Sequence, residues 1–502
     1  MATFFDKYKV RSKIMEKQNE VKKVLIVTAF PTYGAGSGVL VTTQAKQYKK
    51  NGLETRIITG NNTTNFEKIP GIQYHVVPFT SEKENSEKIE GQCDFNYLMF
   101  TTHTESTANF WDASLEQIEQ YQKVFRKAIS QEVKEFKPDV IHAQHNWISS
   151  SIASEFHVPV VVTIHGTDLM GFERSKEEIK NIQSKMKQKL EPEEKKRLEA
   201  ELRKYNLYIE QANCSAINAK KIIVISEAQK EKFAQLFPLA ASKVELVKNG
   251  YDPEKNYRKE VGREELKKLT STYASNHKVP TDYDKMVLFV GKFAEFKGID
   301  VLLDAAKKYE TKMGEKGKKV LTVIVGSGQL EEKLQNQAKD LQLENTHFVG
   351  RKTIDEINLL QNLADVSLVP SRNEPFGLVV IEGAACGHPV IGTNAGGIPD
   401  ILNITGKKIK QIYLPEDVNN PDILKPDEGT KGTYTTPLGM LVPMEDSQEL
   451  ADAVIKILDG EKKFDSNFIA DYIKQNYSQD NITKDILRIF NEVSQKSIGV
   501  ER

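Results

Sequence analysis

Short aliphatic runs alternate with amphipathic stretches along most of this chain. From Lys23 onward, runs rich in Val, Ile and Leu are separated by longer segments whose apolar residues recur at helical spacing. Parallel strands are buried on both faces, so they read as continuous apolar runs joined by crossover helices. The pattern predicts strands at 24–28, 55–58, 140–142, 160–164, 222–225 and 244–246, and again at 286–290, 321–325, 347–349, 366–369 and 390–392. We therefore expect an α/β fold with two doubly wound, Rossmann-like domains.

A polar segment in the middle of the chain divides the two sets of strands. It predicts an N-terminal domain over residues 22–250, a hinge over 251–284 and a C-terminal domain over 285–480, because domain boundaries fall in exposed, polar linkers. Residues 1–21 precede the first strand and read as an N-terminal extension. Helical periodicity in 481–502 predicts a terminal helix, and whether it packs back on the N-terminal domain stays open.

Two further segments read as insertions. Within about 176–209, apolar residues recur at helical spacing on both sides of Pro192, a residue type that favours the first turn of a helix. This predicts an antiparallel helix pair, whose many Lys and Glu residues are typical of a solvated face. A homo-oligomer contact or a peripheral membrane contact is the alternative. The second segment, about 403–434, is rich in Pro, Gly, Asp and Lys and predicts a long surface loop.

Composition and charge narrow the classes of partner. The chain has 502 residues, enough for two apolar cores, and its 70 Lys and Arg balance its 70 Asp and Glu. Without a net positive field, nucleic acid is not an expected partner. The three cysteines share no metal-ligand spacing, so we expect reduced thiols in a cytoplasmic protein. No apolar run approaches the roughly 18 residues of a spanning helix, and the charged N-terminus differs from a secretory signal.

The strongest local signal for chemistry lies at 371–382, a segment that follows a predicted strand and opens a helix. Ligands of open parallel sheets bind at the carboxyl ends of strands. If the helix begins near Pro375 or Phe376, its first backbone N–H groups have no partner within the helix and suit an anion such as a diphosphate. The residues that we expect to bind in this way are Phe376, Gly377 and Leu378.

Two glutamates accompany this segment. Glu374 lies in the loop before the expected helix, and Glu382 lies about two turns into it, roughly 9 to 10 Å further along the axis. That separation suits the two ends of one ligand, and it exceeds the roughly 5 Å between the carboxylates of a retaining hydrolase. The alternative is that Glu374 caps the helix while Glu382 lies on its exposed face.

Lysines and glycines follow two other predicted strands. Lys292 and Lys297 come directly after the strand at 286–290. Two ammonium groups at one strand end can neutralise a diphosphate and stabilise a leaving nucleotide, whereas either lysine alone would read as a solvated residue. The Gly-Ser-Gly turn at 326–328 ends the next strand and permits a ligand to approach the backbone closely.

The N-terminal half carries two comparable turns. Gly36 and Gly38 lie between the first strand and a helix, an arrangement that favours phosphate binding. Val39 takes the place of the last glycine of a dinucleotide fingerprint, and no acidic residue ends the next strand, so a dehydrogenase is not expected. His165 follows the strand at 160–164, a position more typical of an active-site histidine than of a core histidine.

Taken in order, these motifs resemble the family 4 retaining glycosyltransferases over about residues 22 to 480. The segments that carry the resemblance are 34–38 (GAGSG), 138–143 (PDVIHA), 165–168 (HGTD), 224–227 (VISE), 249–252 (NGYD), 291–298 (GKFAEFKG), 326–328 (GSG), 348–350 (FVG), 374–382 (E-x7-E) and 395–399 (AGGIP). The resemblance implies the GT-B fold, in which two Rossmann-like domains face each other across a cleft that binds a nucleotide-sugar donor. The expected donor is a UDP-sugar, with ADP and GDP as alternatives, and the expected acceptor carries a hydroxyl.

The resemblance also implies roles for individual residues. Glu382 would bind the ribose hydroxyls, Glu374 would face the transferred sugar, and Lys297 would hold the diphosphate. His165 would lie across the cleft, near the sugar and the acceptor. The backbone that would border the nucleobase is that of Gly350 and Arg351.

Two features of the family bear on the chemistry. It usually has arginine where this chain has Lys292, and a lysine offers a point charge where arginine offers a two-pronged donor. The family needs no metal or other cofactor, and no Asp-x-Asp ligand pair stands out in this sequence. Its proposed front-face chemistry, in which the leaving phosphate oxygen takes the acceptor proton, agrees with the lack of an obvious general base.

Two other functions use the same residues. A GT-B nucleotide-sugar epimerase would hold the donor in the same way and release an altered nucleotide sugar without an acceptor. A non-catalytic sugar-nucleotide-binding scaffold would use the charged helix pair as its working surface. The glutamates, Lys297 and His165 favour transfer over both, and analysis of the products would separate them.

Overall fold

The computed structural model describes residues 20–34, 36–81, 90–101, 106–268, 280–409 and 420–498. The predicted extension at 1–21 therefore lies, up to residue 19, outside the described residues. The chain divides into two compact units. The first comprises Met1–Ile225, Gln229–Val247 and Ile482–Arg502, and the second comprises Ser226–Ala228 and Lys248–Asn481.

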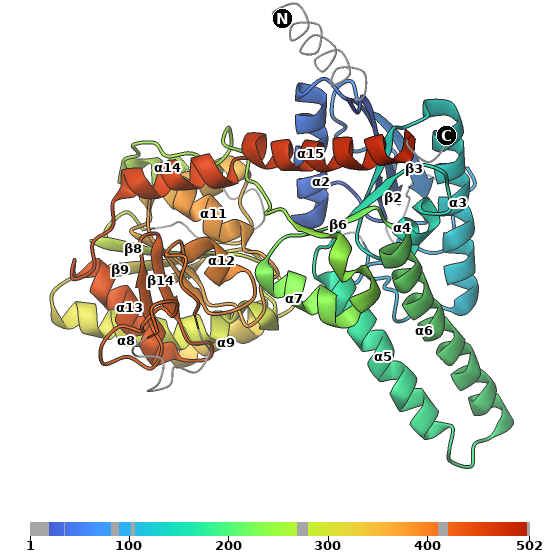
Figure 1. Ribbon diagram of the computed structural model, residues 1–502. Helices are drawn as coiled ribbons and strands as arrows, with labels where there is room; N and C mark the ends of the chain where they lie inside the picture. Colours follow the sequence, from blue (N-terminus) through green and yellow to red (C-terminus); the bar gives the residue numbers. More distant parts are fainter. Residues whose placement is uncertain are drawn as a thin grey trace, which may run out of the picture. The chain divides into compact units, whose positions relative to one another are not determined.

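The first unit is built on a sheet of seven strands (Figure 1). All of its neighbouring strands pair in parallel. Across the sheet they are β3 (Gln73–Pro78), β2 (Glu54–Asn61), β1 (Lys23–Thr28), β4 (Val140–Gln144), β5 (Val160–Thr163), β6 (Lys221–Val224) and β7 (Val244–Leu246). Only β3 escaped prediction, because this edge strand is mostly half-buried and gives no continuous apolar run.

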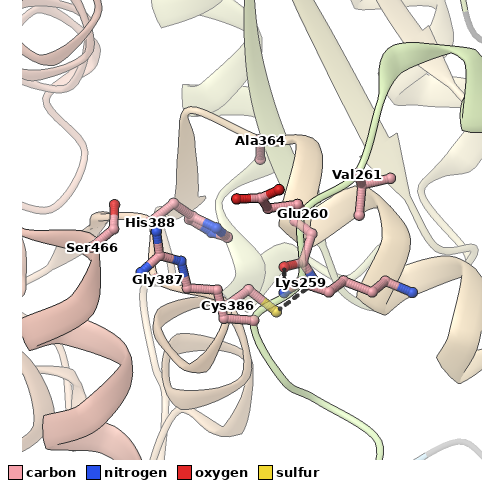
Figure 2. A pocket seen from close by; sticks show the side chains of 10 residues that line it. Lys259, Glu260, Val261, Ala364, Cys386, Gly387, His388 and Ser466 are labelled. Carbon is pink, nitrogen blue, oxygen red and sulfur yellow. Dashed lines mark hydrogen bonds between the residues drawn. The ribbon is translucent and has the colours of Figure 1, made fainter.

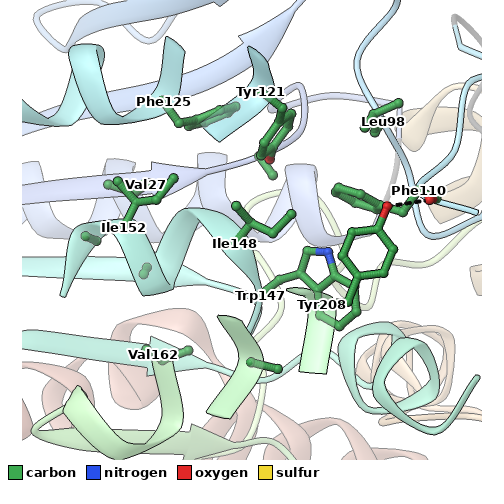
Figure 3. Close-up of a cluster of buried hydrophobic side chains, with 14 of the residues drawn as sticks. Val27, Leu98, Phe110, Tyr121, Phe125, Trp147, Ile148, Ile152, Val162 and Tyr208 are labelled. Atoms are coloured by element: carbon green, nitrogen blue, oxygen red, sulfur yellow. Dashed lines mark hydrogen bonds between the residues drawn. The ribbon is translucent and has the colours of Figure 1, made fainter. Parts of the chain in front are cut away.

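Alternate residues of the central strands enter two cores, one on each face of this sheet. Leu25 and Val27 of β1 join the larger core, while Val24 and Ile26 join the smaller. Aromatic rings fill the larger core (Figure 3), where the buried Tyr208 hydroxyl donates to the carbonyl of Phe110 over 2.5 Å. The helical elements of the unit are α2 (Gly36–Lys50), α3 (Leu115–Phe136), α4 (Ile148–Ala153), α5 (Thr167–Lys185), α6 (Pro192–Asn218), α7 (Glu227–Leu236), η1 (Pro238–Lys243) and α15 (Gln479–Ile498).

The smaller core of the first unit includes residues from the far end of the sequence. Ile486 and Ile489 of α15 are buried in it beside strand residues. Phe490 packs on the ring of Tyr48 from α2 and on the ring of His142 from β4, with centroid separations of 5.5 and 5.3 Å. The terminal helix, whose position the sequence left open, thus completes the core of the first unit from Ile482 onward.

The helix pair predicted at 176–209 is present and is longer than expected. Helices α5 and α6 form the whole connection between β5 and β6, and they run side by side away from the sheet in Figure 1. Pro192 opens α6, as predicted. The C-terminal half of α6 packs on the unit, where the partly buried Lys204 amine donates to the carbonyls of Trp111 and Ala113 over 2.6 and 2.9 Å.

The second unit also has a sheet of seven strands, six of them parallel. Across it lie β10 (Thr346–Phe348), β9 (Val320–Val325), β8 (Lys285–Val290), β11 (Val366–Val369), β12 (Val390–Thr393), β14 (Gly439–Val442) and the antiparallel edge strand β13 (Tyr434–Thr436). The helical elements are η2 (Arg263–Lys268), η3 (Glu295–Lys297), α8 (Ile299–Glu315), α9 (Glu331–Asp340), α10 (Ile354–Leu363), α11 (Leu378–Ala385), α12 (Ile398–Leu402), α13 (Ser447–Leu458) and α14 (Ser466–Tyr477). Two doubly wound units of this kind match the predicted fold class.

The segment predicted as a hinge at 251–284 groups with the second unit wherever it is described. The N–H of Tyr257 donates to the Asn358 side chain, and that of Lys259 donates to the Asn362 side chain, both on α10. Leu266 of η2 is buried in the core of the unit. Two backbone N–H groups of this polar segment are thus satisfied by amide side chains of α10, and whether the segment acts as a hinge stays a prediction.

The described parts of the predicted loop at 403–434 also pack on the second unit. The Thr433 side chain is buried and bonds Glu449 of α13, and the chain then enters β13, which the sequence did not reveal. The cysteines Cys93, Cys214 and Cys386 are all free. None of the helices in the described segments is both long enough and apolar enough to span a bilayer.

Candidate functional site

The second sheet reverses its strand order between β8 and β11, and the loops beyond these two strands lie at the same edge. Ligands of doubly wound sheets bind at such a switch point, outside the carboxyl ends of the strands. The loop after β8 carries Lys292 and Lys297, and the loop after β11 carries Glu374. The topology therefore gathers the charged residues that the sequence singled out in this half.

Glycines let these loops approach one another closely. Gly326 follows β9 with φ of 143°, and a Cβ atom on it would lie 1.8 Å from the carbonyl oxygen of Gly291. Gly298 has φ of 64°, and a Cβ there would lie 2.0 Å from the carbonyl oxygen of Pro370. A side chain at either position would push the loops apart. Loop packing alone therefore explains why glycine is needed at position 326 of the GSG motif and at position 298 of the GKFAEFKG motif.

Lys297 and Glu374 form an ion pair at the switch point. The Lys297 amine donates to Oε2 of Glu374 over 2.5 Å, and their side chains are only 18% and 11% exposed. Charge-assisted bonds between poorly solvated groups fix geometry well. The structure therefore brings together the two residues of this unit that the sequence placed nearest the reaction.

Two more cations lie at the same edge. The guanidinium of Arg351, after β10, donates to the Ser327 hydroxyl over 2.7 Å, which ties it to the Gly-Ser-Gly turn. The pKa of Lys292 is lowered, first by burial and then by the positive charge of Arg351. Gly350 has φ of 67°, and its carbonyl accepts from the N–H of Gly326. The edge therefore presents Lys292, Lys297 and Arg351 beside the Glu374 carboxylate, which is itself ion-paired, and such a group of cations suits an anionic ligand.

Helix α11 begins later than the sequence suggested, so the predicted anion-binding residues lie at its first position and in the loop before it. The helix starts at Leu378, with Gly377 as its N-cap at φ of 109°, so the N–H of Phe376 lies outside it. The left-handed conformation of Gly377 replaces the expected helical start near residue 375 or 376. Leu378 keeps the unsatisfied N–H of a first helical residue.

Glu382 consequently lies just over one turn into α11, and not two. The residue is half-buried, and desolvation of its carboxyl group raises the pKa to about 7. Carboxyl groups whose pKa lies near 7 occur often at functional sites. Glu382 is less exposed than the alternative, a surface residue on an exposed helix face, would require, and its role stays a prediction.

The Gly-Gly pair of the 395–399 motif packs directly against the backbone of the Glu374 loop. A Cβ on Gly396 would lie 2.0 Å from the Glu374 carbonyl oxygen, and one on Gly397 would lie 2.7 Å from Cα of Phe376. The N–H of Gly397 donates to the same Glu374 carbonyl over 2.8 Å. Ser226, whose motif the sequence noted without a role, donates its hydroxyl to the Pro375 carbonyl over 2.9 Å. The backbone at Glu374 is thus held from two sides.

Sequence reasoning missed Arg372, which lies two residues before Glu374. Its guanidinium makes a bidentate pair with Asp300, with distances of 2.9 and 2.7 Å, and it also bonds Glu445. Arg372 precedes the first glutamate of the motif, and nothing in a single sequence identifies its partners, which lie more than 70 residues away.

In the first unit, the corresponding edge is aromatic and carries histidines. His165 follows β5, and its Nε2 lies 2.8 Å from Oε1 of the buried Gln144 at the end of β4. The ring of His145 lies 4.5 Å from that of His165 and 4.9 Å from that of Phe30, which follows β1. Burial lowers the pKa of His165 to about 4. His165 is therefore a neutral hydrogen-bonding group at physiological pH.

Asp168 holds the turn that carries His165. Its buried carboxylate accepts from the N–H groups of Gly166, Leu169 and Asn146, with distances of 2.9, 3.1 and 2.8 Å. Burial raises the pKa of Asp168 to about 6, while these bonds oppose the shift. Asp168 thus has a structural role within the HGTD segment.

The two glycines of the first loop differ. A Cβ on Gly38 would lie 2.5 Å from the carbonyl oxygen of Pro31, so Gly38 is required for packing of α2 against the loop. Gly36 is the first residue of α2, and space around it is open. Of the two predicted phosphate-binding glycines, only Gly36 leaves room for a ligand beside its Cα.

A cavity of about 310 Å³ in the second unit lies elsewhere (Figure 2). It is lined by His388, Cys386 and Ala364, which precede β12 and β11 and so lie at the amino-terminal edge of the sheet. Loops at the carboxyl edge carry the charged residues described above, so we place the candidate site there. Within the described segments, no cluster of three or more His, Cys, Asp or Glu side chains has metal-binding geometry.

Comparison with known proteins agrees with this geometry. The profile of the group described as Glycosyl transferases group 1 matches residues 274–409, and that of Glycosyltransferase Family 4 matches residues 103–255. Together the two matched segments span more than half of the chain. The first match contains the Lys297 and Glu374 loops, and the second contains His165.

Individual relatives cover smaller parts. An uncharacterized glycosyltransferase of Methanocaldococcus jannaschii is 36% identical over 138 residues, which are 28% of this chain and 35% of that protein. The chain spans from about a third to about half of the length of the curated relatives that it matches.

Solved structures share the fold over almost the full length. Sucrose-phosphate synthase from Thermosynechococcus elongatus has a TM-score of 0.61 at 17% identity, covering 95% of this chain and all of that one. The Anabaena protein HepE, in complex with UDP and glucose, has a TM-score of 0.59 at 17% identity, covering 94% of this chain and 100% of that one. These neighbours have the GT-B architecture of two doubly wound units. With both family profiles matched in order along one GT-B fold, this chain belongs to the family 4 glycosyltransferases.

Proposed function

We propose that this protein is a retaining, metal-independent glycosyltransferase, which moves a sugar from a UDP-sugar to a hydroxyl group of its acceptor. The observation that carries the proposal is the Lys297–Glu374 pair at the switch point of the second sheet, with Lys292 and Arg351 at the same edge. Cations at this position can neutralise a diphosphate, a task that other enzymes give to a metal ion. The carboxylate of Glu374 can accept hydrogen bonds from sugar hydroxyls.

The chemistry assigned to these residues is charge stabilisation. The bond between the anomeric carbon and the diphosphate oxygen breaks, the acceptor oxygen bonds to the same face of that carbon, and the leaving oxygen takes the acceptor proton. Negative charge grows on the leaving diphosphate, where Lys297 and Lys292 would stabilise it. His165, neutral at pH 7, would supply a hydrogen bond to the sugar rather than accept the proton.

Other observations support the nature of the donor. Glu382 has a pKa raised to about 7 by burial, and a ribose would offer its carboxylate two hydroxyl donors in compensation. HepE, which shares the fold, holds UDP and glucose. The nucleobase is proposed to lie beside the backbone of Gly350 and Arg351, and the sugar beside Glu374.

Slow hydrolysis of candidate donors tests the proposal without knowledge of the acceptor. The protein is incubated with UDP-, ADP- and GDP-sugars in the presence of EDTA, and release of free nucleotide is followed by chromatography. We expect release from a UDP-sugar, with the same rate without EDTA, and a much slower but measurable release in Glu374→Gln. Conversion of the donor into another nucleotide sugar without free nucleotide would indicate an epimerase. Nucleotide binding with no turnover of any donor, even with a panel of hydroxylated acceptors, would contradict the proposal.

A further inference from the structure

One arginine connects three loops at the carboxyl edge of the second sheet. We propose that Arg372 is a positioning residue that holds Lys297 and Glu374 in register, so that the pair keeps the geometry needed for transfer. The inference rests on the proposed function, because it assigns Arg372 a task within that site. It does not require Arg372 to touch the donor.

All five N–H groups of the Arg372 guanidinium are used. Nη1 donates to the Glu295 carbonyl over 2.5 Å and to Oδ1 of Asp300 over 2.9 Å. Nη2 donates to Oδ2 of Asp300 over 2.7 Å and to Oε2 of Glu445 over 3.0 Å, and Nε donates to Oε1 of Glu445. Five donors in one rigid plane fix their acceptors in direction as well as distance.

The partners of Arg372 flank Lys297, while Arg372 itself lies in the loop of Glu374. Glu295 and Asp300 lie on either side of Lys297 in sequence, and both are bonded to the guanidinium. The backbone N–H of Arg372 also donates to the Phe296 carbonyl of this same loop over 2.8 Å. Glu374 follows two residues later in the same loop. A shift of Arg372 would therefore move Lys297 and Glu374 relative to each other.

Backbone conformation supplies independent support. In the described segments, four residues other than glycine have positive φ, namely Lys137, His145, Gln342 and Glu445. Lys137 and Gln342 follow the C-terminal ends of helices, where this conformation is common. Glu445 is not at the end of a helix but in a turn after β14, with φ of 61°. Strained backbone of this kind persists where surrounding contacts over-determine it, and it concentrates at functional sites.

The contacts suit positioning better than global stabilisation. The side chains of Arg372, Asp300 and Glu445 are 26%, 42% and 56% exposed, and ion pairs this exposed add little to stability. Hydrogen bonds to Asp300 and Glu445 raise the pKa of Arg372, so the side chain stays charged at every accessible pH. Small displacements of reacting groups, by contrast, reduce rates strongly.

The test compares Arg372→Met, which removes all five donors, with Arg372→Lys, which keeps the charge but loses the planar fork. The first measurement does not depend on enzymatic activity. It is the rate at which acetic anhydride modifies the Lys297 amine, monitored by mass spectrometry. We expect this rate to rise several-fold in Arg372→Met and less in Arg372→Lys. The second is donor hydrolysis, where we expect kcat to fall by about tenfold to a hundredfold in Arg372→Met while the affinity for UDP stays within about twofold.

The matched control is Lys285→Met. It breaks the 2.8 Å pair between Lys285 and Asp365, which is exposed to a similar degree but lies at the start of β8, at the opposite edge of the sheet. Lys297 labelling and turnover should match the parent in this variant. A loss of turnover equal to that of Arg372→Met would mean that general destabilisation explains both, and would overturn the proposal.

A double variant separates positioning from an independent effect. If Arg372 acts through the ion pair, Arg372→Met should slow Glu374→Gln no further, whereas multiplied losses would overturn the proposal. If Arg372→Met does not fold, Asp300→Asn weakens the same contacts and is read with the same labelling assay. Unchanged labelling of Lys297 in a folded variant overturns the inference. A parent protein without any donor turnover contradicts the proposed function alone, because labelling still reports on the arginine.

Discussion

The carboxyl edges of the two sheets occupy the same place in two similar folds, yet they differ in electrostatic character. The edge of the second unit combines Lys292, Lys297 and Arg351 with ion-paired carboxylates. At the edge of the first unit, His145 and His165 are packed among aromatic rings. Burial lowers the pKa of both histidines, to about 4 for His165, so they carry no charge at pH 7.

The difference teaches that one architecture can serve two binding tasks. Half-exposed cations keep their charge and suit an anionic ligand such as a diphosphate. Buried, neutral imidazoles suit the hydroxyl groups of an uncharged ligand, where one hydrogen bond contributes about 0.5–1.5 kcal/mol. Variants that remove or change the charged groups of the second unit or the neutral imidazoles of the first test whether this difference between the two edges matters for function.

The largest effect is expected from Lys297→Met. Removal of one preorganised donor from a site of developing charge lowers turnover by about a hundredfold to a thousandfold. The affinity for UDP should fall far less, because the charge on the leaving group is greatest in the transition state. Steady-state donor hydrolysis and calorimetry with UDP measure the two quantities. Equal losses in both would show that Lys297 contributes ground-state binding alone.

Glu382→Gln should weaken UDP binding by about tenfold to a hundredfold, as expected for hydrogen bonds to a charged group. The parent should show a related pH dependence. Its pKa of about 7 means that Glu382 is protonated at pH 6, so UDP affinity should decline as the pH falls below 7. Calorimetry at several pH values checks this. An affinity that does not change between pH 8 and 6 in the parent would contradict the assignment to the ribose.

The same variant should be more stable than the parent at alkaline pH. The folded-state pKa of Glu382 lies above its ordinary value of 4.5. Between about pH 4.5 and 7 the folded chain keeps a proton that the unfolded chain has lost, so the parent loses stability as the pH rises through this window. Glutamine cannot ionise, and we expect a gain of about 1–2 kcal/mol at pH 8 and none at pH 4. Denaturant unfolding at both pH values measures it.

His165→Ala tests the neutral edge. Loss of one neutral hydrogen bond should lower kcat/KM by about tenfold and leave UDP affinity unchanged. Because the pKa of His165 is about 4, the parent should show no rate change from this group between pH 6 and 8. The pH profiles of parent and variant, measured side by side, should be parallel. A limb near pH 6.5 that disappears in the variant would mean that His165 titrates as a free imidazole.

The smallest effect is expected from Lys292→Arg. The planar guanidinium offers a two-pronged contact with phosphate in place of a point charge, which should raise UDP affinity about threefold. Lys285→Arg, the same change at the opposite edge of the sheet, is the control and should bind UDP as the parent does. A drop in affinity in Lys292→Arg would indicate that the space beside Arg351 is too small for a second guanidinium.

Much of the fold could be predicted because parallel strands leave a strong pattern. Eleven runs predicted the strands of both sheets, and the order of motifs predicted the family. The strands that escaped, β3, β13 and β14, are an edge strand and a short hairpin at the edge of the other sheet. β3 and β13 have no continuous apolar run, so periodicity does not reveal them. β14 has an apolar run at 440–442, but this run is only three residues long, between Gly439 and Pro443, and it was not recognised.

The candidate site was predicted less completely, for reasons of geometry. The proximity of Lys297 and Glu374 could be expected, since strand ends of one sheet converge. The start of α11 could not, because the left-handed conformation of Gly377 moves it by two residues. Arg372 was missed because its function depends on Asp300 and Glu445, which only the folded chain brings to it. The roles of the individual site residues remain predictions.

The terminal helix also determines when the first unit can finish folding. During synthesis, domains fold as units as soon as their residues emerge, at about 5–20 residues per second. Here the rings of Tyr48 and His142 lack their contact with Phe490 until α15 has been synthesised, which happens after the whole second unit has been made. For a period on the order of tens of seconds, the nascent protein exposes the apolar face that α15 later covers. A chaperone would bind during this interval. A chain that ends before α15 would keep this apolar face exposed permanently.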